Sequence, residues 1–178
     1  MTVKGYFKVA GECGDCSMCC KVMAIPELGK ADGEWCKHIC KNHKGCGIYE
    51  TRPAVCRDFL CLWRRDAAAP LSMRPDKCGV VFGGGTRPDI ISAYVDPGRP
   101  DAWKKPEVWK MIETLVRRGG YNVVVTTRDP LKRIIFYMEG GMMLRVDKHF
   151  TPPDKEGVQW VIHDPRHDKV QPVWGPPK

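Results

Sequence analysis

Cysteine is the most constraining residue type in this chain of 178 residues. All ten cysteines fall within the first 78 residues, at positions 13, 16, 19, 20, 36, 40, 46, 56, 61 and 78. Such a cluster indicates either a disulfide framework or bound metal. The stretch from Met1 to Glu12 lacks the apolar run of a secretory signal. We therefore expect a cytoplasmic protein whose thiols stay reduced and bind metal.

The segment that holds most of these cysteines has little apolar periodicity. Residues 13–61 contain many turn formers, Gly14 and Gly29 among them, and too few apolar side chains to fold by burial alone. Metal crosslinks would supply the missing stabilisation, as they do in small zinc domains. Residues 52–63 are the exception and predict a helix, with Pro53 in its first turn.

Charge and hydropathy narrow the range of partners. The formal net charge is +8, but lysines and arginines are scattered singly or in pairs, which is typical of a solvated surface. Eight thiolates holding two zinc ions would lower this charge to about +4. No apolar run approaches the roughly 18 residues that a membrane helix needs. We expect the chain to bind a protein partner. We expect it neither to bind nucleic acid nor to insert into a membrane.

The first cysteine motif is Cys13-x2-Cys16-x2-Cys19-Cys20. A CxxC turn directs two sulfur atoms at one ion because the backbone between them curls around it. The three spaced cysteines also resemble the loop that holds three corners of a [4Fe–4S] cluster, although the Cys-Pro that completes that loop is missing. Four sulfur ligands suit either zinc or iron–sulfur. Zinc is our preferred assignment, and an iron–sulfur cluster is the alternative.

The second motif carries a resemblance to a known family. The run from Cys46 to Cys61 reads CGIYETRPAVCRDFLC. It resembles the C-x-IY-x-x-RP-x-x-CR-x-F-x-C signature of the CxxCxxCC cysteine-cluster family, which is described as a zinc- or iron-chelating domain. The opening motif and Cys36, with Ile39 three residues later, match the same family. The resemblance covers about residues 13–61.

The resemblance implies a set of eight metal ligands. They are Cys13, Cys16, Cys19, Cys20, Cys36, Cys46, Cys56 and Cys61. Cys40 and Cys78 fall outside the pattern. Eight thiolates divide into two four-sulfur sites, and adjacent Cys19 and Cys20 point in different directions, so they serve different ions or bridge between two. Spacing alone leaves open which cysteines share an ion.

Residues beside the second motif are candidates for a supporting role. Arg52 and Arg57 can donate hydrogen bonds to the sulfurs and offset the negative charge of a four-thiolate zinc site. Tyr49 and Phe59 can pack over the site and exclude water. In the alternative interpretation Arg52 caps a turn, Arg57 is solvated and the two aromatic residues belong to an ordinary core.

Two functions follow from these motifs. The first is a metal-binding protein that chelates two zinc ions and serves as a structural or partner-binding module, since a site closed by protein ligands is usually structural. The alternative is an iron–sulfur protein with a redox or metal-dependent enzymatic role. Some members of the resembled family look like flagellin lysine methylases, but the chain contains no cofactor-binding motif that supports this activity.

The rest of the chain predicts an α+β fold. We expect a cysteine-cluster module over residues 1–78, a small sheet region over 79–150 and a proline-rich extended tail over 151–178. Residues 1–12 predict a short strand or arm. The sheet region should be a small, mostly antiparallel sheet with one covering helix. Its expected elements are strands at 79–82, 90–95, 122–127, 131–138 and 142–146 and a helix at 107–118, with a flexible glycine-rich turn at 83–86.

Overall fold

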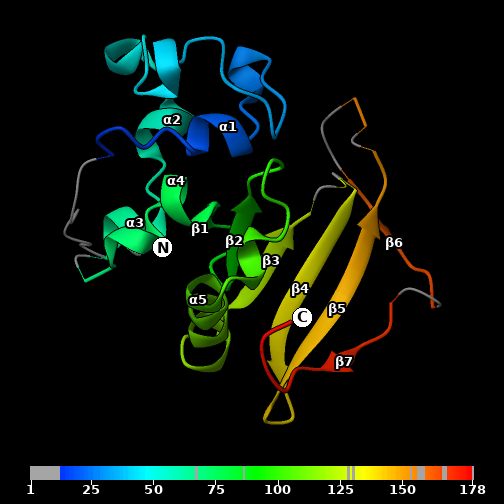
Figure 1. The fold of residues 1–178 in the computed structure, drawn as a ribbon. Coiled ribbons are helices and arrows are strands. Elements are labelled where there is room, and N and C mark those ends of the chain that lie inside the picture. Colours follow the sequence, from blue (N-terminus) through cyan, green and yellow to red (C-terminus); the bar gives the residue numbers. More distant parts are fainter. Residues whose placement is uncertain are drawn as a thin grey trace.

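The structure is a computed structural model that describes residues 13–66, 68–85, 87–127, 129, 131–152, 154–155, 159–165 and 168–177. We divide it into a cysteine-rich region, residues 13–66, and a sheet region, the described residues from 68 onward. The cysteine-rich region lies against one end of the sheet (Figure 1). The strand or arm expected over residues 1–12 lies outside the described residues.

Short helices and loops make up the cysteine-rich region. The α-helices are α1 (Cys19–Val22), α2 (Ala54–Asp58) and α3 (Leu62–Arg65), and the 3-10 helices are η1 (Pro26–Leu28), η2 (Lys41–His43) and η3 (Tyr49–Thr51). The helices η4 (Leu71–Met73) and α4 (Pro75–Cys78) then lead into the sheet. Each helix is too short to be stable alone, so tertiary contacts or ligands must hold it.

The prediction of a single helix over residues 52–63 is wrong. The structure divides this segment into α2 and α3. Phe59, which follows α2, and Cys61, which precedes α3, both adopt extended backbone angles. Both side chains contact a small apolar cluster that includes Val81 of the sheet. Because a continuous helix would turn these two residues away from each other, the tertiary contact overrides the helical periodicity.

The sheet has seven described strands. They are β1 (Val80–Gly84), β2 (Ile90–Val95), β3 (Asn122–Thr126), β4 (Lys132–Glu139), β5 (Met142–Phe150), β6 (Val161–Ile162) and β7 (Gln171–Pro172). Their order is β1-β2-β3-β4-β5-β6, and β7 also pairs with β5. Only β2 and β3 among these strands run parallel, because helix α5 (Pro106–Arg117) crosses over between them. The expected α+β class, with a mostly antiparallel sheet and one covering helix, is confirmed.

The main core lies between α5 and one face of the sheet. The helix places Val108, Ile112 and Val116 against the sheet, and all three are fully buried. Trp109 of the helix meets Phe136 of β4 edge to face, with ring centroids 5.3 Å apart. The 3-10 helix η5 (Ala102–Lys104) adds Trp103, 5.9 Å from the same phenyl ring. Burying each of these side chains contributes roughly 1.5–3 kcal/mol to folding.

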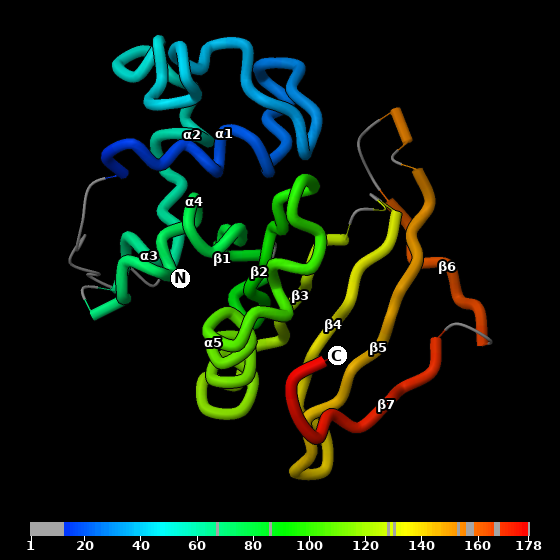
Figure 2. Tube along the Cα trace, in the orientation of Figure 1, coloured from blue at the N-terminus to red at the C-terminus, as the bar shows by residue number. Residues whose placement is uncertain are grey.

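The cysteine-rich region covers the opposite face of β1 and β2. Met18 and Val22 around α1 pack against Val81, whose side chain points away from the α5 core. The ammonium of Lys21 lies 2.7 Å from a carboxylate oxygen of Asp96, just after β2. Figures 1 and 2 show α5 and the cysteine-rich loops on the two sides of these strands.

The glycine run predicted as a flexible turn is largely part of strand β1. Gly83 and Gly84 pair with Ser92 and Ile91 of β2, and the described turn residues are 87–89. A Cβ atom on Gly83 would lie 2.6 Å from the ring of Phe59. Glycine is therefore required at this position because an aromatic ring of the cysteine-rich region rests directly on the strand.

The described helices include none with the length and apolar character needed to cross a bilayer.

Candidate metal centre

All eight motif cysteines line one cavity in the cysteine-rich region. The cavity has a volume of about 150 Å³. Cys40 and Cys78, the two cysteines outside the motif, do not line it. Cys40 is exposed, and the buried Cys78 thiol instead donates to the carbonyl oxygen of Val80 at 3.2 Å. The fold thus separates the ten cysteines in the same way as the motif does.

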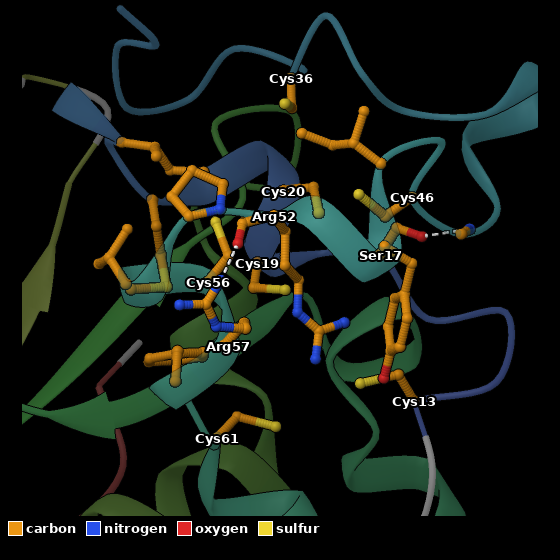
Figure 3. Close-up of a pocket in the computed structure, with 18 of the residues that line it drawn as sticks. Cys13, Ser17, Cys19, Cys20, Cys36, Cys46, Arg52, Cys56, Arg57 and Cys61 are labelled. Atoms are coloured by element: carbon orange, nitrogen blue, oxygen red, sulfur yellow. Dashed lines mark hydrogen bonds between the residues drawn. The ribbon is translucent and has the colours of Figure 1, made fainter. Parts of the chain in front are cut away.

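All ten cysteines lie in the described part of the chain, and all carry free thiols. The sulfur atoms surround the cavity and do not meet at a point, so the described residues contain no preassembled group of three Cys, His, Asp or Glu ligands. Figure 3 shows the sulfurs spread along the cavity wall. Metal binding would require the side chains to rotate inward, as staggered χ1 rotamers permit.

The first motif is positioned by a turn followed by a short helix. The backbone N–H of Cys16 donates to the carbonyl oxygen of Cys13 at 2.9 Å, and Gly14 between them adopts φ +52°. Cys19 and Cys20 are the first two residues of α1. Consecutive helical residues point about 100° apart, so these two sulfurs leave the helix in different directions.

Each cysteine of the second motif is placed at the same cavity by a different local structure. Cys46 forms an isolated β-bridge with Ile39, which brings the loop back beside the first motif. Cys56 lies within α2, and Cys61 caps α3. The N–H of Gly45 also donates to the hydroxyl of Ser17 at 2.9 Å, which joins the two motifs directly.

Burial and neighbouring charges shift the thiol pKa values in opposite directions. Burial raises the pKa of Cys16 to about 11 and also raises the pKa values of Cys56 and Cys61. A hydrogen bond from the Cys19 thiol lowers the pKa of Cys20 to about 7, and burial opposes this shift. At neutral pH the thiols of Cys16, Cys56 and Cys61 are therefore protonated, so binding a metal there must release protons.

Lys30 is a cation beside the cavity that the sequence did not indicate. Its buried ammonium donates to the carbonyl oxygens of Lys21, Met23 and Ala31. Its charge also contributes to the lowered pKa of Cys20. The chain folds back at the bridge between Ile25 and Lys30, which sets the position of this side chain.

Arg52 is a predicted supporting residue that lines the cavity. Its guanidinium stacks on the ring of Tyr49 at 3.6 Å from the centroid. Its Nε atom is buried and lacks a hydrogen-bond partner among the described residues. A buried donor of this kind needs an acceptor, which a thiolate held in the cavity would provide. The orphaned donor and the all-sulfur set of candidate ligands both fit a bound metal ion.

The other predicted supporting residues have different surroundings. Arg57 donates from Nη1 to the carbonyl oxygen of Arg52 at 2.7 Å, so its described hydrogen bond goes to the backbone and not to sulfur. Tyr49 lines the cavity but is 50% exposed. Phe59 also lines it and packs against Gly83 of β1. Phe59 therefore connects the cavity wall to the sheet.

No protein-family model matches the chain, and no curated protein or solved structure shows significant similarity to it. The resemblance to the CxxCxxCC family stays a prediction that rests on the motif residues.

Proposed function

We propose that this chain is a metal-binding protein that chelates two zinc ions through the thiolates of its eight motif cysteines. The observation that carries the proposal is their arrangement. Cysteines from two motifs separated in sequence line one cavity, and the two remaining cysteines do not. Eight thiolates supply the ligands of two tetrahedral zinc sites.

The composition of the cavity wall supports a structural role for the metal. The wall contains no histidine, aspartate or glutamate among the described residues, so sulfur would fill every protein ligand position. Zinc sites closed by four protein ligands are structural, whereas catalytic sites keep one position open for water or substrate. The bound ions would fix the short helices and loops that surround them.

Two further features support the proposed setting. Ten free thiols suit the reducing cytoplasm, where we place the protein. Trp160 and Trp174, close to β6 and β7, are 66% and 84% exposed. Large exposed aromatic side chains are favoured anchors in protein–protein contacts, which supports a protein partner for this module.

Elemental analysis of the anaerobically purified full chain tests the proposal. We expect a colourless protein with two zinc ions per chain, and the exposed-cysteine variant Cys40→Ser should keep both. A brown protein with broad visible absorption and bound iron would instead establish the iron–sulfur alternative. A folded full chain that binds neither metal would contradict the proposal.

A further inference from the structure

Four of the eight cysteines gather on the side of the cavity that faces the sheet. Cys16, Cys19 and Cys61 all pack against one apolar cluster, which is built around Val81 of β1. Cys13 joins them because the turn hydrogen bond to the Cys16 amide holds it one turn away. Cys61 is the last cysteine of the second motif. It nevertheless lies beside the cysteines of the first motif and apart from Cys46 and Cys56.

The other four gather on the side that faces away from the sheet. The N–H of Cys36 donates to the carbonyl oxygen of Cys20 at 3.0 Å. The N–H of Ile39 donates to the carbonyl oxygen of Cys36, and Ile39 bridges to Cys46. A chain of backbone contacts therefore connects these three cysteines. In Figure 3, Cys20, Cys36 and Cys46 lie toward one end of the cavity and Cys13 and Cys61 toward the other.

Cys56 is the remaining cysteine of the cavity wall, and it lies within α2. It therefore completes the second group of four. Cys19 and Cys20 are adjacent at the start of α1, so the two groups meet there.

The geometry points to two separate four-sulfur sites, which we call the inner site and the outer site. This inference rests on the proposed function. The inner site comprises Cys13, Cys16, Cys19 and Cys61. The outer site comprises Cys20, Cys36, Cys46 and Cys56. Helix α1 contributes one cysteine to each, because its first two residues point in different directions.

This division gives the two ions different tasks. The inner ion would join the first motif to Cys61 and so hold in place the side chains that pack around Val81 of β1. The outer ion would join α1, the loop around Cys36 and helix α2, which have no described backbone pairing with the sheet. Loss of the outer ion should loosen these loops and leave the attachment to the sheet in place.

Stepwise metal removal from the unmodified full chain tests the division without relying on any variant to fold. A zinc chelator is added in increments, thiols released at each step are alkylated, and tryptic peptides are analysed by mass spectrometry. Cleavage separates residues 31–37, which carry Cys36, and 45–57, which carry Cys46 and Cys56, from 58–64, which carry Cys61. We expect the first two peptides to be alkylated in the same step and the third in a different one.

Other labelling patterns overturn the division. Alkylation of Cys61 in the same step as Cys36, while Cys46 and Cys56 stay protected, would show that the sulfurs form mixed sites. The zinc content of the starting protein is measured first, and it tests the proposed function on its own. Two bound ions with mixed labelling would therefore refute the division and leave the proposed function standing.

Two double variants provide a second test. Both contain Cys61→Ser, and the other substitution is at Cys19 in one variant and at the adjacent Cys20 in the other. Cys19→Ser with Cys61→Ser removes two ligands from the inner site, so one zinc ion per chain should remain. Cys20→Ser with Cys61→Ser damages both sites, so no ion should remain. Equal zinc content in the two double variants would overturn the division, and Cys40→Ser serves as the two-ion control.

Discussion

The two regions of this chain are stabilised in different ways. The sheet region holds a continuous core in which α5, η5 and strands β1–β5 bury aliphatic and aromatic side chains. Residues 13–66 bury only four apolar side chains, Met18, Val22, Ile25 and Cys36. Ordering each residue costs about 1–2 kcal/mol of backbone entropy. Burial can meet this cost in the sheet region. The cysteine-rich region buries too few apolar side chains to do so, which is why we propose that bound metal stabilises it.

Loss of one metal ligand should have the largest effect. We expect Cys56→Ser to lose one zinc ion and to leave the loop around Cys36 and helix α2 unfolded, because metal binding and folding are coupled and a structural zinc ion contributes about 10–16 kcal/mol. Solubility, zinc content and circular dichroism measure the effect. The control Cys40→Ser changes an exposed cysteine outside the cavity and should behave as the parent. Equal stability of the two variants would mean that the cysteines do not determine the fold.

A cavity in the sheet core should destabilise the chain without removing metal. Phe136 is 1% exposed and contacts both Trp103 and Trp109. We expect Phe136→Ala to lower the free energy of unfolding of the sheet region by about 3–5 kcal/mol, because it removes apolar contacts and leaves a void. Denaturant unfolding followed by tryptophan fluorescence measures this change. Zinc content should stay at two ions per chain, and its loss would show that the two regions are not stabilised independently.

The contact between the two regions can be weakened at one glycine. Gly83→Val places a side chain where the Phe59 ring rests, and we expect it to cost about 1–3 kcal/mol. Gly84→Ala is the matched control, because a Cβ atom there meets nothing within 4 Å. Thermal unfolding and hydrogen exchange of residues 13–66 report the effect. If both variants unfold like the parent, the Phe59 contact does not hold the regions together.

The smallest expected effect concerns Arg52, one of the arginines that line the cavity. Arg52→Met should lower zinc affinity about tenfold, which corresponds to about 1.4 kcal/mol, because it removes a buried charged donor beside the thiolates. Competition with a chelator of known affinity measures the change. Arg57→Met is the comparison variant, since Arg57 hydrogen-bonds to the backbone carbonyl of Arg52. Matching affinities in these two variants would remove the special role given to Arg52.

The sheet region was the easier part to predict from the sequence. Helix α5 lies within one residue of its expected bounds because its apolar residues recur at helical spacing and Pro106 marks its start. Strand β2 matches its expected range of residues 90–95. The parallel pairing of β2 with β3 and the return of β7 to β5 were not predicted, because strand order depends on contacts between distant segments.

The eight cysteines that the family resemblance singled out line one cavity, and their role as metal ligands stays a prediction. How they are arranged around the cavity was not predictable from the sequence. Phe59 and Cys61 were misassigned to a helix because a contact with Val81 sets their backbone. Lys30 was missed because only the fold brings its ammonium near Cys20.

Hydrogen exchange before and after metal removal tests the central claim most directly. The full chain is stripped with a chelator under reducing conditions, and elemental analysis verifies the loss of metal. We expect the amides of residues 13–61 to lose protection while those of β3 and β4 keep theirs, and added zinc should restore the first group. Unchanged protection of residues 13–61 in the verified metal-free chain would contradict the account.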